Sequence, residues 1–307
     1  PARGPGDMAP APVPVWRPLP DVAFGSFAGL AGTPPVRGRS LAGSGGVLQA
    51  GWYEGGDCPG GSLSVPPKVT AGVRGDLACD RLAVGPGAAL VVTGHLRGPK
   101  KAATVLSLEE GARLVVGGNA DLERIRLQAT STGPQAALLV VGGELDVQED
   151  VAAGGNGVGP IPPLAVLALD RSDCTFAACG PDDTNAIRIG QLKVPEFLLY
   201  AERMPGSGAQ QSGSRINLEL AAAGDDGDRD RGGVAGHRGG EGQGGPGDGD
   251  RPRLTPVTVR GAVVAAGDVE IRASGLKVTW STGLELLAPY LGVVPAQVFY
   301  TVEAWQG

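Results

Sequence analysis

The stretch AALLVVGGELDVQEDV at residues 136–151 contains the pattern that decides the fold. Four aliphatic residues, 138–141, are followed by two glycines and then by a segment of alternating polarity at 144–147. Short aliphatic runs cut by glycine pairs are typical of strands and turns, and they lack the spacing of an amphipathic helix. The stretch therefore predicts two short strands joined by a tight turn.

The aliphatic run recurs along the chain at a nearly constant interval. Val92, Val116 and Val141 end three such runs at almost equal steps, and one further step of the same length leads to Val166 in a fourth run. A repeat of about 25 residues is the signature of a solenoid, in which each coil buries its apolar strands against the next coil. We therefore predict an all-β fold, a β-solenoid (β-helix). Small aliphatic residues would fill it, because aromatic residues make up only 4% of the chain.

Three regions are predicted in the 307-residue chain. Residues 1–45, rich in proline and glycine, are expected to form an extended N-terminal arm, and full disorder is an equally favoured alternative for the first 15 residues. Residues 281–307 are expected to form a small closing element, a C-terminal helix and strand. Between them, residues 46–280 form the solenoid, with loop excursions at 154–163, 171–186 and 224–253. The apolar residues that can pin the arm to the solenoid are Trp16, Val22, Phe24, Phe27 and Leu30.

The composition argues against several classes of ligand. The formal net charge of −6 gives no general support for nucleic-acid binding, although a local basic patch is compatible with it. The glycine- and aspartate-rich residues 224–253 lack the regularly spaced apolar residue of a Ca²⁺-binding repeat, so a solvated loop is favoured over a Ca²⁺ site. No apolar run is long enough to span a membrane. We predict no metal, no cofactor and no membrane span in this chain.

The four cysteines form two separated pairs, Cys58 with Cys79 and Cys174 with Cys179. Neither pair has the Cys-x-x-Cys spacing of a zinc site. An even number of paired cysteines favours disulfides and an exported protein over free thiols. Our prediction is sequential pairing, although four cysteines permit three connectivities.

The C-terminal third carries a further pattern, a series of short aliphatic phrases in a fixed order. The phrases are LLYA at 198–201, VRGAVVAAGDV at 259–269, VTW at 278–280, a leucine-rich turn at 284–291 and VEAW at 302–305. This order resembles the accessory and minor pilins of type IV pili of the PilX type, and the larger competence minor pilins of the ComZ type, which carry a β-solenoid. The resemblance implies an extracellular location and other pilins as partners. The apolar N-terminal helix of such pilins is not in this sequence; either it was removed, or the chain is a soluble secreted relative.

Catalytic motifs are scarce. The only two histidines, His95 and His237, stand alone, so no nucleophilic triad is predicted and His95 is expected on the surface of a coil. Asp121, Asp146 and Asp170 recur at the interval of the repeat and would stack on adjacent coils, as the carboxylates of β-solenoid lyases and glycosidases do. We interpret these aspartates mainly as the polar turn residue of each coil.

The sequence therefore predicts a non-enzymatic extracellular protein of the pilus or cell surface, acting in adhesion, tip presentation or DNA uptake. Its partners would be other pilins or surface proteins, and its ligand a glycan or DNA. Two alternatives stay open: a carbohydrate-active β-solenoid lyase or hydrolase, and a self-assembling structural β-solenoid filament. The candidate ligand-binding residues lie in two of the loop excursions and are Arg171, Arg229, Arg231, Arg238, Arg251 and Arg253.

Overall fold

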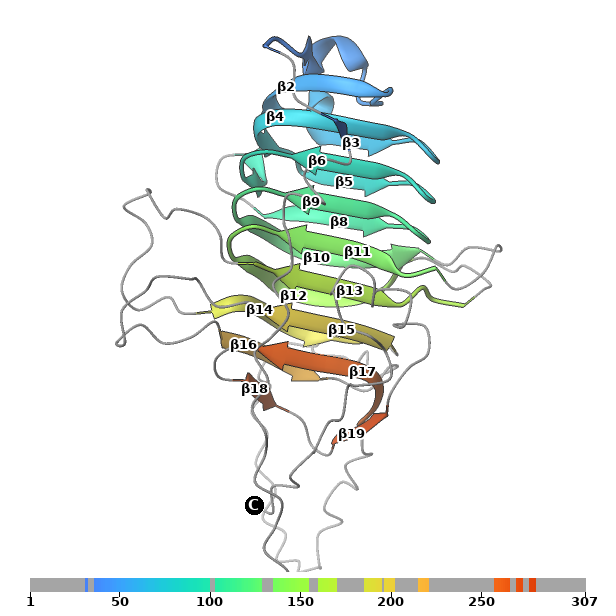
Figure 1. The fold of residues 1–307 in the computed structure, drawn as a ribbon, viewed down its shortest axis with the longest axis vertical. Helices are drawn as coiled ribbons and strands as arrows, with labels where there is room; N and C mark the ends of the chain where they lie inside the picture. Colours follow the sequence, from blue (N-terminus) through green and yellow to red (C-terminus); the bar gives the residue numbers. More distant parts are fainter. Residues whose placement is uncertain are drawn as a thin grey trace, which may run out of the picture.

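The computed structural model describes most of the predicted solenoid. The described residues are 31–32, 36–99, 103–128, 135–154, 160–169, 185–194, 196–201, 215–220, 257–265, 269–272 and 276–279. Within these ranges the protein consists of 19 β-strands and short 3₁₀ helices, with no α-helix. The strands stack one above another from β2 at one end to β19 at the other (Figure 1). Every pairing between described strands is parallel, which confirms the all-β solenoid predicted from the repeat.

The coils have three faces, which we number in chain order. Face 1 contains the first parts of β2 (Gly51–Asp57) and β4 (Thr70–Ala78), then β6 (Ala89–Val92), β9 (Arg113–Val116), β11 (Ala137–Val141), β13 (Leu164–Ala168), β15 (Glu196–Ala201) and the second part of β17 (Val257–Ala265). Face 2 contains the ends of β2 and β4, β7 (Leu96–Arg97), the first parts of β10 (Ala120–Gln128), β12 (Leu145–Gly154), β14 (Asn185–Leu192) and β16 (Arg215–Leu220), and β18 (Val269–Arg272). Face 3 contains β3 (Ser62–Val65), β5 (Arg81–Val84), β8 (Thr104–Leu108), the second parts of β10 and β12 and the last residues of β14 and β16. At the far end, β19 (Leu276–Thr279) lies beside the first part of β17.

The long strands pass around the corners between faces. Strands β2 and β4 cross from face 1 to face 2, and their pairing shifts register between Glu54 and Gly56. Strands β10 and β12 cross from face 2 to face 3, with a shift between Leu122 and Arg124. Gly75 at the corner of β4 has φ +89°, a backbone conformation that glycine adopts without strain. These shifts are β-bulges, which bend a strand where the coil has to turn.

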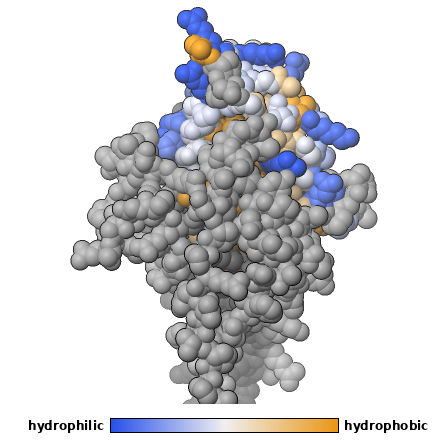
Figure 2. Space-filling view, viewed as in Figure 1, coloured by the Kyte–Doolittle hydropathy of each residue, from blue (hydrophilic) through white to orange (hydrophobic). Residues whose placement is uncertain are grey.

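The core is built from rows of aliphatic side chains that point inward and repeat from coil to coil. On face 1, Leu90 pairs with Leu114, Leu114 with Leu139, and Leu139 with Val166. All four are fully buried, in one continuous hydrophobic cluster. The described surface at the β2 end of the stack is mixed, with strongly hydrophilic residues beside smaller apolar patches (Figure 2). Because each core side chain packs on its equivalent in the next coil, stability in such a fold is a sum over neighbouring coils.

The predicted repeat is confirmed for three coils and is wrong by two residues in the fourth. Val92 pairs with Val116 and Val116 with Val141, as the spacing predicts. The partner of Val141 is Ala168, not Val166. One extra residue lies in the bulge of β12 between Val147 and Asp150, and a second lies between β12 and β13. Together they make that coil two residues longer, and a shift of two keeps each side chain of β13 on its own side of the strand.

The predicted boundaries need three small corrections. The solenoid begins before residue 46, because β1 (Arg39–Ser40) pairs with β2 and is followed by a 3₁₀ helix, η2 (Leu41–Ser44), whose Leu41 is buried in the core. Gly154 belongs to β12, so the excursion at 154–163 starts one residue later. The excursion at 171–186 ends sooner, because β14 starts at Asn185. Residues 1–30, 224–253 and 281–307 lie outside the described ranges. Among the described residues, no helix is long and apolar enough to cross a membrane.

Candidate functional site

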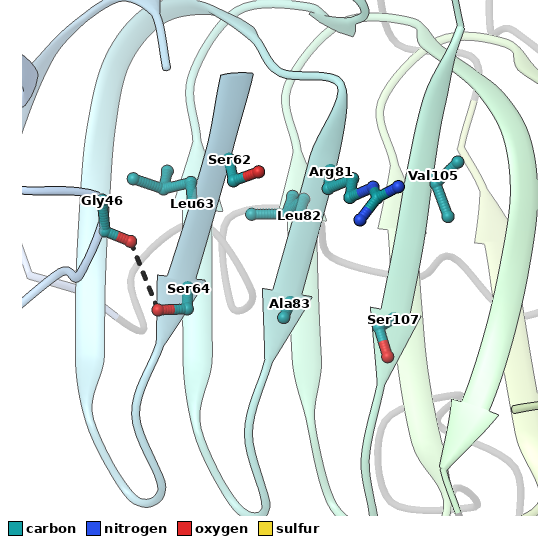
Figure 3. Close-up of a pocket in the computed structure, with 9 residues that line it drawn as sticks. All are labelled: Gly46, Ser62, Leu63, Ser64, Arg81, Leu82, Ala83, Val105 and Ser107. Carbon is teal, nitrogen blue, oxygen red and sulfur yellow. Dashed lines mark hydrogen bonds between the residues drawn. The ribbon is translucent and has the colours of Figure 1, made fainter. Parts of the chain in front are cut away.

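The outer side of face 3 has a depression with a volume of about 300 Å³. Three adjacent strands, β3, β5 and β8, form its floor (Figure 3). Its lining residues are Gly46, Ser62, Leu63, Ser64, Arg81, Leu82, Ala83, Val105 and Ser107. Serine hydroxyls, an arginine and small apolar groups thus come together from coils that are distant in sequence.

The alternation of side chains along each strand explains why these residues meet. Leu63 and Leu82 point into the core and are 2% and 1% exposed. Their neighbours in sequence therefore point outward. The parallel register places Ser62, Arg81 and Val105 in one row, and Ser64, Ala83 and Ser107 in a second row beside it. Figure 3 shows the first row in that order, with Arg81 between Ser62 and Val105.

The polar groups of the depression are only partly used by the protein. The Ser64 hydroxyl donates a hydrogen bond to the carbonyl of Gly46 at 3.2 Å, and the Gln128 amide donates one to the Ser107 hydroxyl at 3.3 Å. Arg81 is exposed and forms no ion pair with any residue that the structure describes. A guanidinium can bind a carboxylate, and hydroxyls beside it can form hydrogen bonds with neutral oxygens.

An ion-pair cluster lies in the coils that follow. Arg126 donates to Asp150 with 2.6 Å between nitrogen and oxygen, and Lys193 is 3.8 Å from the other oxygen of Asp150. Arg124 forms an ion pair with Glu149. These cations are engaged with carboxylates of the neighbouring coil, which clamps β10 to β12. Arg81, in contrast, is the cation of the depression that no described carboxylate neutralises.

Face 2 carries a second row of charged residues. Asp121 lies opposite Asp146 on the next coil, so the first two of the three predicted aspartates stack. The residue opposite Asp146 in the following coil is Arg188, whose side chain is 3.9 Å from the Asp146 carboxylate. The alternative of a column of three carboxylates is therefore wrong, because an arginine occupies the third place. The favoured interpretation as turn residues is wrong as well, because Asp121 and Asp146 lie within β10 and β12. Asp170 itself lies outside the described residues.

The carboxyl group of Asp121 is perturbed by its position in this row. Although Asp121 is exposed, desolvation beside the neighbouring strands raises its pKa, and the positive fields of His95 and Arg97 oppose that effect. Asp146 is paired with Arg188, so the two carboxylates are in different electrostatic surroundings. No group of three or more metal-ligating side chains occurs among the described residues.

A ladder of side-chain acceptors lines the turn between faces 1 and 2. The carboxylate of Asp76 accepts from the backbone N–H of His95 at 2.9 Å, and His95 Nδ1 accepts from the backbone N–H of Asn119 at 2.9 Å. The Asn119 side-chain oxygen accepts in turn from the backbone N–H of Glu144 at 3.1 Å. His95 thus has a structural role on the coil surface, and each turn satisfies a backbone donor of the next coil.

One of the two predicted disulfides is present. Cys58 and Cys79 follow β2 and β4, occupy equivalent places on adjacent coils and are bonded, with 5.1 Å between their Cα atoms. Both are buried, and the Cys79 carbonyl accepts a hydrogen bond from the hydroxyl of Thr104. The structure describes neither Cys174 nor Cys179, so their pairing stays a prediction.

Known proteins give no guide to these surfaces: a scan against protein-family models and searches of the curated proteins and the solved structures found no match to this chain. The function is therefore inferred from the residues and geometry of the chain itself.

The candidate arginines predicted from the sequence stay a prediction. Arg171, Arg229, Arg231, Arg238, Arg251 and Arg253 all lie outside the described ranges. Sequence reasoning expected binding residues in loops and missed Arg81, Ser62 and Ser107 on the strands. The signal that could have found them is an alignment of successive coils. If Ser62, Arg81 and Val105 are aligned as equivalent positions, their side chains fall on one face.

Proposed function

We propose that this chain is a non-enzymatic extracellular protein of the cell surface or pilus that binds an acidic glycan on the outer side of face 3. The observation that carries the proposal is the exposed Arg81 guanidinium, which forms no ion pair with a described residue and lies in the depression between Ser62 and Val105. A sugar carboxylate matches the planar guanidinium in a bidentate pair. Ala83 and Val105 provide the apolar contact that a sugar ring needs.

The disulfide supports the extracellular part of the proposal. Disulfides such as Cys58–Cys79 persist in oxidising compartments and are rare in reducing ones. The ion pairs and hydrogen bonds that join successive coils make the stack a rigid support. A rigid support with flat faces suits a protein that presents a binding surface away from the cell, as adhesion or presentation at a pilus tip requires.

Duplex DNA is the less favoured polyanion. DNA binding depends on several cations that neutralise phosphates together. Arg81 is the single cation among the residues that line the depression, whereas Arg124 and Arg126 are engaged with Glu149 and Asp150. The net charge of −6 also opposes a long polyanion more strongly than a short uronate oligomer.

A second candidate function rests on the stacked aspartates of face 2. Asp121 and Asp146 are directly opposite each other, and the pKa of Asp121 is raised, as a general acid requires. A glycoside hydrolase or lyase would use such a pair. The Arg188 partner of Asp146 and the position of both aspartates on a flat face make this the weaker candidate.

The test is a titration of the purified chain with three probes: a hexamer of a uronic acid, a neutral glucose hexamer and a short DNA duplex. We expect the uronate to bind best, and Arg81→Gln to weaken it about tenfold, the loss of roughly 1.4 kcal/mol that one charge-assisted hydrogen bond provides. Arg113→Gln removes the same charge from face 1 and is the matched control. Equal affinities for the Arg81 and Arg113 variants would reject the site.

The same preparation separates the two candidates. Turnover of the uronate that is lost in Asp146→Asn and kept in Arg81→Gln would assign the chain to the enzyme class. Binding without turnover that depends on Arg81 and is unchanged in Asp146→Asn supports the adhesive function.

A further inference from the structure

The outer side of face 1 carries a continuous apolar row, unlike the outer sides of the other two faces. One row of outward residues runs through seven coils in direct register: Trp52, Gly72, Val91, Val115, Val140, Leu167 and Tyr200. We call these residues the outer row. Their counterparts on faces 2 and 3 include serines, aspartates and arginines, which are ordinary residues of a solvated surface.

The side chains of the outer row point away from the core and are nevertheless buried. Val115 and Val140 are 0% exposed, and Tyr200 is 2% exposed. They form a hydrophobic cluster separate from the core, together with outward residues of the neighbouring row such as Leu138 and Leu198. A strand that is apolar and buried on both sides needs a covering layer on its outer side as well as the core on its inner side.

The described contact that reaches this row from outside the coils is Ala31. Ala31 packs against the cluster, and its carbonyl accepts a hydrogen bond from the Trp52 indole N–H at 2.9 Å. The indole ring lies so close to Gly72 that an added Cβ atom there would overlap it. The chain therefore meets the first coil of the outer row at Ala31, directly after the segment formed by residues 1–30.

We propose that residues 1–30 form a strap that covers the outer row and anchors the N-terminal arm to face 1. The row from Trp52 to Tyr200 crosses six strand spacings, about 29 Å at roughly 4.8 Å each. A segment of this length in a polyproline conformation spans about 90 Å, which is ample. The strap has the apolar side chains that such a surface needs, at Trp16, Val22, Phe24, Phe27 and Leu30.

Other segments of the chain fit the outer row less well. Residues 224–253 are mostly glycine and charged residues and offer almost nothing apolar. Residues 281–307 contain enough apolar side chains, but the last described strand before them, β19, lies at the opposite end of the stack from Trp52. The contact at Ala31 therefore favours the N-terminal segment. This inference is independent of what face 3 binds.

Thiol labelling in the full chain tests the strap. Val140→Cys places a reporter in the middle of the outer row, and Ser107→Cys places one on the open outer side of face 3. We expect maleimide to label Val140→Cys at least about tenfold more slowly than Ser107→Cys, as protection by a covering segment requires. Labelling is measured separately at each introduced cysteine by peptide mass spectrometry. No reductant is added, so disulfide-bonded native cysteines do not react with the maleimide.

Two sets of substitutions then identify the covering segment. Trp16→Ser, Phe24→Ser, Phe27→Ser and Leu30→Ser together should raise the labelling rate of Val140→Cys about tenfold. The matched set, Leu286→Ser, Leu287→Ser, Tyr290→Ser and Leu291→Ser, should leave it unchanged. Fast labelling of Val140→Cys in the parent chain, or release by the C-terminal set alone, would overturn the strap. Protection that disappears on dilution of a dimeric parent would assign the row to a second copy and would overturn it too.

Discussion

The imidazole of His95 accepts a hydrogen bond at Nδ1 from the backbone N–H of Asn119, with the two nitrogen atoms 2.9 Å apart. Asn119 occupies the same turn position one coil later and repeats the arrangement with Glu144. Two chemically different side chains thus have one structural task, to satisfy a backbone donor of the next coil. Gly118 allows the close approach, because a Cβ atom there would be 2.7 Å from His95 Nδ1.

The ladder predicts which substitutions at His95 are tolerated. His95→Asn supplies an oxygen acceptor of the kind used at Asn119, so the free energy of unfolding should change by less than about 0.5 kcal/mol. His95→Leu removes the acceptor and leaves the Asn119 N–H without a partner, at a cost of about 1–2 kcal/mol. Urea unfolding followed by circular dichroism measures both. Equal losses for the two variants would mean that packing of the ring, not the acceptor, is what the turn requires.

The repeat and the inward core could be predicted from the sequence, because the aliphatic runs return at an almost fixed interval. The two-residue error at Val166 arose because a coil can lengthen in a turn without changing which side chains point inward. The early coils also differ in length, since the step from Ser62 to Arg81 is shorter than the step from Arg81 to Val105. Because these steps differ, a fixed repeat does not align Ser62, Arg81 and Val105, and the depression on face 3 was not predicted.

The buried outer row left a signal in the sequence that the repeat alone does not interpret. The runs that end at Val116 and Val141 are apolar at consecutive positions, where a half-solvated strand would alternate. All residues of β11 and β13 are buried in the structure. A continuous apolar run in a parallel strand predicts cover on both sides. The sequence indicates apolar residues of the arm that can pin it to the solenoid, but it does not indicate which face they cover, because an extended segment carries no periodicity.

Removal of the Asp121 charge should stabilise the protein near neutral pH. The folded-state pKa of Asp121 is raised above its ordinary value of 3.8, mainly by desolvation. The folded state therefore holds the proton more tightly than the unfolded state does, and stability falls as pH rises through this window. Asp121→Asn should increase the free energy of unfolding at pH 7 by less than about 1 kcal/mol, because the side chain is partly solvated.

The pH dependence distinguishes this effect from a simple change in packing. The gain from Asp121→Asn should be smaller at pH 4 than at pH 7, since the parent carboxyl is then partly protonated. Asp57→Asn is the control, because Asp57 is also exposed on the same face but lies at the end of β2, near the start of the stack. A gain that does not change with pH would exclude electrostatics as its cause.

Loss of the Cys58–Cys79 disulfide should destabilise the first coils. The bond joins residues 21 positions apart, so Cys58→Ser with Cys79→Ser should lower the free energy of unfolding by about 3 kcal/mol. Reductant should destabilise the parent by a similar amount and affect the double variant much less, because the predicted Cys174–Cys179 bond closes only a short loop. Thiol titration of the denatured, unreduced parent should find no free thiol; two would contradict the second predicted pair, Cys174–Cys179.

The contact between Trp52 and Gly72 provides the last prediction. A Cβ atom on Gly72 would overlap the Trp52 ring, so Gly72→Ala must displace the indole and weaken its hydrogen bond to Ala31. We expect a loss of about 1–3 kcal/mol, the usual cost of overpacking. Gly43→Ala is the control, because an added Cβ there meets nothing within 4 Å. In a Trp52→Ala background the clash is absent and the cost of Gly72→Ala should nearly vanish, a coupling that a double-mutant cycle measures. An equal cost in both backgrounds would show that the backbone of β4, and not the indole, requires glycine.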